Sequence, residues 1–287
     1  MGSYDFTTLY TSIPHDKLLY ALKSVCDDAF KCSKKPYLIA SKSRAYWSDK
    51  MVKSKASICF TQDTLMEYME YLINNIYVTF DNIVYHQVIG IPMGTDCAPV
   101  VANLFLFYYE HKYIANLDDL DLELQYSFTE FTSRYIDDLL VLNDNDIFPS
   151  IMADIYPIEM QLLPTHDSNT RVTFLDLDIS VKNKMFQCSL YDKRNDFNFK
   201  VTSMPHFNSN APNSCAIGTF VSQMTRYLEI NTDFSKFVED CVTLKRKLIQ
   251  QRFPTKYLNF GIKKFVDKNS LVIINKFWTI PKFKDFN

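Results

Sequence analysis

Hydrophobic and polar positions follow two different periods along the chain, and together they predict an α+β protein. Apolar residues spaced three and four apart predict helices over residues 15–30, 61–76 and 98–114, with a short one near 146–156. Apolar runs and alternating positions predict a strand that runs into a loop over 3–11, and strands at 77–88, 134–142, 171–181 and 184–193. The segment at 77–88 is a hairpin that turns at Asp81-Asn82. Residues 31–56 read as a polar, lysine-rich connection.

Beyond about residue 212 the pattern becomes helical, with segments near 216–230, 233–250 and 254–266. Charge changes sign over the same region. Residues 1–180 hold 13 Lys and Arg against 25 Asp and Glu, whereas residues 181–287 hold 18 against 8. A basic segment with interleaved aromatic residues is a plausible track for a phosphate backbone, although each basic cluster alone is also typical of a solvated helix face. We therefore expect two domains, 1–192 with an inserted segment 31–56, and a helical basic part at 193–287.

Composition narrows the class of protein. With 47% hydrophobic and 22% charged residues, the chain is typical of a globular protein. No apolar run is long enough to span a membrane and the first residues lack a targeting signal, so we expect an intracellular protein, nuclear or cytoplasmic. The seven cysteines are scattered and form no C-x-x-C pair, which predicts neither a disulfide framework nor a zinc site.

The stretch RYIDDLLVL (134–142) places two adjacent carboxylates, Asp137 and Asp138, between apolar arms. It predicts a hairpin with both carboxylates at its tip. Two carboxylates held together near an apolar surface repel one another unless a cation lies nearby, and a divalent metal is the usual one. A solvated turn is the alternative, because Asp-Asp pairs also occur in polar surroundings at 27–28 and 118–119.

Two further segments carry possible chemistry. Asp5 lies at the end of a predicted strand and could join Asp137 and Asp138 if the strands are neighbours, although alone it could be a turn or capping residue. Three carboxylates suit a pair of Mg²⁺ ions, which prefer oxygen ligands. The loop around Gly90 and Gly94 would let a flat ligand approach the backbone ahead of a helix, and it does not match a Walker A loop.

These segments resemble a known family. DFTTLYTSIPH, GIPMGTDCAPVVANLF and RYIDDLL occur in the order and wording of motifs A, B and C of reverse transcriptases. The wording, with FLDLDI and LYDKRNDF downstream, resembles the reverse transcriptases of Penelope-like retroelements, which are relatives of telomerase. The resemblance implies a palm, with an antiparallel sheet and packed helices, followed by a mostly helical thumb. We expect the fingers subdomain, which normally precedes motif A, to be largely absent from this chain.

The resemblance also implies roles for individual residues. The catalytic, metal-binding carboxylates are Asp5, Asp137 and Asp138. The residues implied to contact the nucleotide or primer are Tyr10, Phe6, Gly90, Pro92, Met93, Gly94 and Tyr135. Tyr10 is implied to exclude a 2'-hydroxyl, and a tyrosine of the core is the alternative. The basic residues expected to bind nucleic acid are Lys193, Arg194, Lys245, Arg246, Lys247, Lys263 and Lys264. Phe174 to Asp178 would form the strand that links palm to thumb.

The function implied is RNA-directed DNA polymerisation. It transfers a nucleotide from a dNTP to a primer 3'-hydroxyl with two Mg²⁺ ions, for which Mn²⁺ can substitute. Its partners are an RNA template, a DNA primer and a fingers segment, encoded upstream or supplied by a separate chain. The alternative is a catalytically silent remnant of palm and thumb that only binds nucleic acid.

Overall fold

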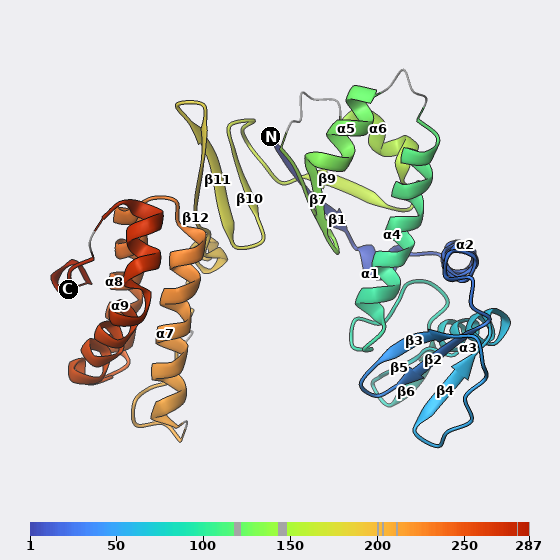
Figure 1. Cartoon of the computed structure of the whole chain (residues 1–287), viewed down its shortest axis with the longest axis horizontal. Helices are drawn as coiled ribbons and strands as arrows, with labels where there is room; N and C mark the ends of the chain where they lie inside the picture. The colour runs from blue at the N-terminus through green and yellow to red at the C-terminus, as the bar shows by residue number, and fades with distance from the viewer. Residues whose placement is uncertain are drawn as a thin grey trace. The chain divides into compact units, whose positions relative to one another are not determined.

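The computed structural model describes residues 1–117, 122–142, 148–199, 201–202, 204–210, 212–279 and 281–286. The chain divides into two compact units, with antiparallel sheets and helices in both (Figure 1). The N-terminal unit is Gly2–Pro164, and the C-terminal unit is Thr165–Asn287 together with Met1. The expected α+β class is confirmed. No helix in the described ranges is long and apolar enough to cross a membrane.

The N-terminal unit is built on a four-stranded antiparallel sheet of order β7-β8-β1-β9. Its strands are β1 (Gly2–Thr7), β7 (Thr132–Tyr135), β8 (Asp138–Val141) and β9 (Gln161–Pro164). The apolar side chains of β1 and β8, among them Tyr4 and Leu139, are buried in one core with Phe105. The predicted hairpin at 134–142 is confirmed, whereas the short strand β9 has no clear alternation and was not predicted.

Four of the helices of this unit follow the predicted apolar spacing. The helices of the unit are α1 (Leu9–Ser12), α2 (His15–Ser33), α3 (Gln62–Asn74), α4 (Ala98–Ala115), α5 (Leu122–Glu130) and α6 (Phe148–Ile155). The Thr61 side chain accepts a hydrogen bond from Thr64 N and so caps α3. In α4, Ala102, Phe105 and Leu106 are fully buried. The helices expected at 15–30, 61–76, 98–114 and 146–156 are therefore confirmed, and α1 and α5 were not predicted.

The segment expected to be a polar connection at 31–56 is folded, so that expectation was wrong. It contributes to a sheet of order β3-β2-β4, made of β2 (Tyr37–Ser41), β3 (Ala45–Ser48) and β4 (Ser57–Phe60). Ile39 is buried in this sheet, and the Trp47 ring meets Phe30 of α2 edge-on at 4.8 Å. The hairpin of β5 (Tyr77–Phe80) and β6 (Ile83–His86) is confirmed, with Asp81 and Asn82 both at positive φ.

The C-terminal unit joins a three-stranded antiparallel sheet to helices. The strands are β10 (Arg171–Phe174), β11 (Leu177–Lys182) and β12 (Met185–Leu190), followed by the 3₁₀ helix η2 (Lys193–Asp196). The helices are α7 (Asn213–Ile230), α8 (Phe234–Gln250), α9 (Thr255–Phe277) and the 3₁₀ helix η3 (Phe283–Phe286). The expected single strand over 171–181 is wrong, because Leu175 at φ 54° opens a turn that also interrupts the proposed strand Phe174–Asp178.

The division between the units falls at Pro164, ahead of the boundary expected at residue 192. The reason is that the sheet β10-β11-β12 is bonded to the helical segment. Cys188 N donates to Thr232 Oγ1 (3.0 Å), and Thr232 N donates back to Cys188 O (3.0 Å). These paired bonds tie β12 to the link between α7 and α8, so the sheet belongs with the helices.

Candidate active site

The three candidate carboxylates lie on adjoining parts of the central sheet of the N-terminal unit. Asp5 of β1 is the direct antiparallel partner of Asp138, the first residue of β8. Asp137 lies in the turn before β8, and its backbone oxygen accepts a hydrogen bond from Phe6 N (3.1 Å). All three are partly buried. Directly opposed residues in antiparallel strands project to the same face, so Asp5 and Asp138 share a face of the sheet.

The donor set of this site is suited to a hard cation, since three carboxylates supply oxygen ligands. The pairing of β1 with β8 places Asp5 next to Asp138 and next to the turn that contains Asp137. Within the described ranges, however, no group of three or more His, Cys, Asp or Glu side chains is arranged to hold a metal ion. The three carboxylates match Mg²⁺ in the chemistry of their oxygens and in strand position, but their side chains are not gathered around one point in this structure.

A buried polar network, which the sequence pattern did not reveal, holds the turn in place. The Arg134 guanidinium of β7 donates from Nε and Nη2 to the Glu110 carboxylate of α4 (2.5 and 3.0 Å). Its Nη1 donates to Asn103 Oδ1 (2.7 Å) and to the backbone oxygen of Ile136 (3.0 Å), inside the turn. Tyr156 OH also donates to Glu110 (2.9 Å). Arg134 thus fixes the turn that carries Asp137 to the helix α4.

Burial and charge act on the tyrosine of this network. Burial raises the pKa of Tyr156 well above its usual value, and the neighbouring Glu110 carboxylate raises it further. The phenol is therefore protonated and can donate to Glu110 at any physiological pH. The network is a positioning device for the turn.

Tyr10 lies beside the same turn. It belongs to α1, which follows β1 after Thr8 in a left-handed conformation at φ 59°. The pKa of Tyr10 is raised, first by burial and then by the negative charge of Asp137, with Tyr135 contributing. The structure therefore brings Tyr10, Asp137 and Tyr135 into one neighbourhood. Tyr135, which pairs with Asp138 across the hairpin, is 58% exposed.

The loop around Gly90 is bonded to the segment after β1. Gly90 N donates to Ile13 O (2.8 Å), Ile91 N donates to Tyr10 O (2.5 Å), and His15 Nε2 lies 2.8 Å from Gly90 O. Gly90 has φ 81°, and a Cβ there would lie 2.5 Å from Tyr10 O. Only glycine fits at this position, because a side chain would collide with the backbone of α1.

The rest of that loop is open. Pro92 O accepts bonds from Thr95 N (3.2 Å) and Thr95 Oγ1 (3.1 Å), which closes a turn ahead of α4. Met93 is 70% exposed, and an added Cβ at Gly94 would meet no atom within 4 Å. The loop thus has a fixed end at Gly90 and an accessible end at Met93 and Gly94.

Phe6 is a correction to the expected set. Its side chain is buried in the core and meets the Tyr156 ring edge-on at 4.9 Å. The Phe6 ring therefore packs in the core, and its backbone N–H donates to Asp137 O.

The expected basic residues belong to the C-terminal unit and differ in exposure. Lys193, Arg246, Lys263 and Lys264 are exposed. Arg194 forms a two-bond ion pair with Asp192 (2.6 and 2.8 Å), and Lys247 reaches the same carboxylate at 3.4 Å. Lys245 is a correction, because its side chain is buried and its ammonium donates to Phe286 O (3.3 Å). Burial lowers the pKa of Lys245.

The sequence matches no family model, and no curated protein matches it. Its fold is similar to that of telomerase from Candida albicans in complex with the TWJ fragment of telomeric RNA. That match has a TM-score of 0.53 at 12% identity and covers 99% of this chain and 46% of that chain. At this identity the likeness concerns the fold alone.

Two structures of telomerase from Candida tropicalis also match. The apo structure gives a TM-score of 0.44 at 12% identity, covering 96% of this chain and 42% of that chain. The complex with the TWJ fragment of telomeric RNA gives 0.46 at 10% identity, covering 95% and 39%. The chain thus spans less than half the length of each of the three telomerase chains.

Proposed function

We propose that this chain carries the palm and thumb of an RNA-directed DNA polymerase of the Penelope-like type. The palm is the N-terminal unit and the thumb is the C-terminal unit. The observation that carries the proposal is the strand register that sets Asp5 opposite Asp138, with Asp137 in the adjoining turn. The order of the three motifs and the telomerase-like fold support it.

The proposed reaction is nucleotidyl transfer. The primer 3'-hydroxyl attacks the α-phosphorus of a dNTP, a phosphodiester bond forms, and pyrophosphate leaves. Asp5, Asp137 and Asp138 would hold two Mg²⁺ ions, or Mn²⁺ in their place. When bound, such ions activate the attacking hydroxyl and stabilise charge on the leaving oxygen.

The surrounding residues would bind and orient the substrates. Tyr10, whose pKa is raised, would pack under the sugar of the incoming nucleotide and exclude a 2'-hydroxyl. The exposed loop residues Met93 and Gly94 would lie against the nascent base pair. Tyr135 would approach the terminal nucleotide of the primer. A fingers segment, upstream or on a separate chain, would add further contacts to the triphosphate.

The first experiment is primer extension by the purified chain on an RNA template annealed to a DNA primer, with Mg²⁺ and separately with Mn²⁺. We expect extension by the wild type, and none by Asp137→Asn, which removes a metal-ligating charge and leaves the fold intact. Glu70→Gln, an exposed carboxylate on α3, is the matched control and should extend normally. Extension by Asp137→Asn at the wild-type rate would overturn the proposal.

A second candidate is a remnant that binds nucleic acid without catalysis. The exposed cations of the C-terminal unit favour it, because they would bind phosphates whether or not chemistry takes place. Salt-sensitive binding of a template-primer duplex, unaffected by Asp137→Asn and accompanied by no extension, would select this candidate.

A further inference from the structure

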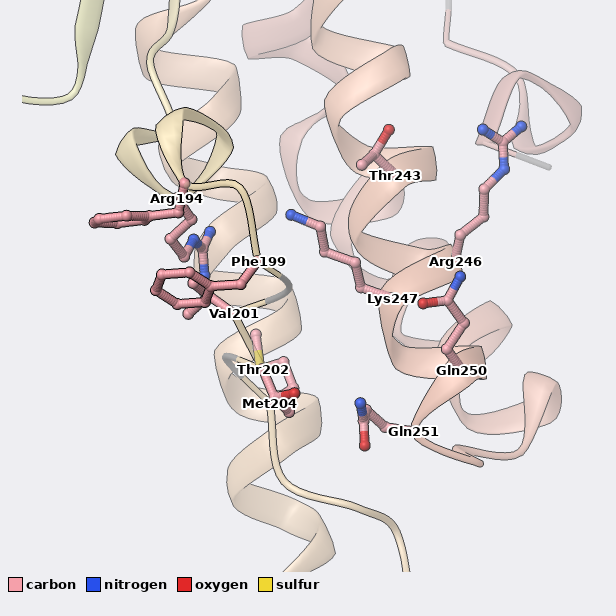
Figure 2. Close-up of a pocket in the computed structure, with 11 residues that line it drawn as sticks. Arg194, Phe199, Val201, Thr202, Met204, Thr243, Arg246, Lys247, Gln250 and Gln251 are labelled. Carbon is pink, nitrogen blue, oxygen red and sulfur yellow. The ribbon is translucent and has the colours of Figure 1, made fainter.

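A groove of about 500 Å³ lies within the C-terminal unit, between α8 and the segment that follows η2. Figure 2 shows its two sides. The segment after η2 carries Phe199, Val201 and Met204, and α8 faces it with Thr243, Lys247 and Gln250. Lys247 extends from the helix toward the opposite side. The volume falls within the range of about 300–1000 Å³ found for small-ligand pockets.

Both sides of the groove are anchored. Asp192 binds Arg194 and Lys247 together, which joins the start of the segment to α8. At the other end, Phe207 N donates to Gln251 O (2.9 Å), and the Phe207 ring packs edge-on against Phe253 at 5.3 Å. The groove is thus preformed.

The lining combines positive charge with exposed aromatic rings. Arg194, Arg246 and Lys247 line it, and no carboxylate does so among the described residues, so Asp192 offsets one of three charges. Phe197 and Phe199 are 49% and 67% exposed, and their rings lie 5.2 Å apart at an angle of 31°. Exposed aromatic rings beside cations are the usual platform for unpaired bases.

We propose that this groove binds single-stranded nucleic acid. The base of one nucleotide stacks on Phe199, and Lys247 and Arg246 bind the phosphate of that nucleotide. The amide of Gln250 lies on the same side as Lys247 and can bond to the edge of the base. The inference rests in part on the proposed function, because it specifies that the nucleic acid bound by the C-terminal unit is single-stranded.

The size and the rings favour a single strand over a duplex. In a duplex the bases are paired and stacked on each other, so a protein meets mainly phosphates and groove edges. In a complex with a duplex, the Phe197 and Phe199 rings would stay exposed to solvent and contribute little to the affinity. An unpaired base can leave the stack and enter a groove of this volume.

The test is binding of short labelled homopolymers, one RNA and one DNA, to the full chain, measured by fluorescence anisotropy at several salt concentrations. Phe199→Leu should weaken binding about 5- to 150-fold with an unchanged salt slope, since stacking is lost but charge is kept. Lys247→Gln should weaken binding and reduce the slope of log K against log salt by about 0.7. The matched controls, Phe260→Leu and Lys268→Gln, change exposed residues of α9 outside the groove and should stay within about twofold of wild type.

The two polymers identify the kind of nucleic acid that binds. Tighter binding of the RNA polymer or of the DNA polymer defines that one as the ligand, and equal binding means that the groove takes either. The proposal is overturned if neither polymer binds, if Phe260→Leu weakens binding as much as Phe199→Leu, or if a duplex of equal length binds as tightly and is weakened as much by Phe199→Leu. Binding is measured without primer extension, metal ion or dNTP, so it succeeds or fails separately from the polymerase reaction.

Discussion

Asp5 and Asp138 lie directly opposite one another where β1 pairs with β8. Like charges in this position cost a sheet about 0.2–1 kcal/mol, and a divalent cation between them would reverse that cost. We therefore expect Mg²⁺ at about ten times its Kd to raise the free energy of unfolding by about 1.4 kcal/mol. Thermal unfolding with and without Mg²⁺ measures this.

The same measurement on variants assigns the ion to this site. Asp5→Asn and Asp137→Asn should lose the Mg²⁺-dependent rise, because each removes a ligand. Glu70→Gln, the exposed control on α3, should keep it. An equal rise in all four proteins would place the ion elsewhere.

The ion pair of Arg134 and Glu110 should contribute far more to the free energy of unfolding than a surface ion pair does. Their side chains are only 11% and 15% exposed, and removing one partner leaves a buried charge unpaired. Arg134→Gln should lower the free energy of unfolding by about 3 kcal/mol or more. Lys17→Gln, which breaks the Lys17–Glu159 pair at 36% and 34% exposure, should lower it by less than about 1 kcal/mol. Urea unfolding compares the two, and equal losses would contradict the structural role of Arg134.

Gly90 and Gly94 form a natural pair of test and control. Gly90→Ala puts a Cβ 2.5 Å from Tyr10 O at a positive φ, so it should destabilise the protein by about 1–3 kcal/mol. Gly94→Ala meets no atom within 4 Å and should change stability by less than about 0.5 kcal/mol. Chemical denaturation measures both. A Gly94→Ala protein that is stable yet poor in primer extension would support a binding role for the open end of the loop.

Asp192 should make stability depend on acid pH. Its hydrogen bonds from Arg194 lower the pKa of Asp192 from 3.8 to about 2 in the folded protein. Because the folded pKa is the lower one, the stabilisation is complete above about pH 4 and is lost as the pH falls toward 2. We expect it to be about 1–2 kcal/mol, since Arg194 is 40% exposed and partly screened. Asp192→Asn should lose less stability than wild type between pH 5 and pH 2, and parallel curves would refute this.

Elements with local signals could be predicted from the sequence. The hairpins at Asp81-Asn82 and Asp137-Asp138 and the helices α2 and α4 each carry their turn residues or apolar period within a few positions. The network around Glu110 carries no such signal, because Arg134 and Tyr156 are 24 and 46 residues away along the chain. Only the tertiary fold brings them together.

Whether a charge cluster lies on the surface is also decided by the tertiary fold and not by the local sequence. Lys245, Arg246 and Lys247 are adjacent in the sequence, but the turn of α8 buries the first and leaves the second exposed. The strands at 37–60 were not predicted, because each alternating stretch is short and the polar, lysine-rich residues around it hide its pattern. The corrections at Lys245 and Phe6 therefore both come from burial, which composition does not determine.

Tyr10 should govern the choice between deoxyribonucleotides and ribonucleotides. Its ring lies beside Asp137, and under the proposed function it occupies the space that a 2'-hydroxyl would need. Forcing an extra group into a packed site costs about 1–3 kcal/mol, so Tyr10→Ala should reduce the preference for dNTP over rNTP by about 5- to 150-fold. Tyr10→Phe keeps the ring and should keep the preference. The measurement is the ratio of kcat/KM for the two nucleotides during primer extension. A preference that survives Tyr10→Ala would assign the discrimination to another residue and leave Tyr10 as a packing residue of α1.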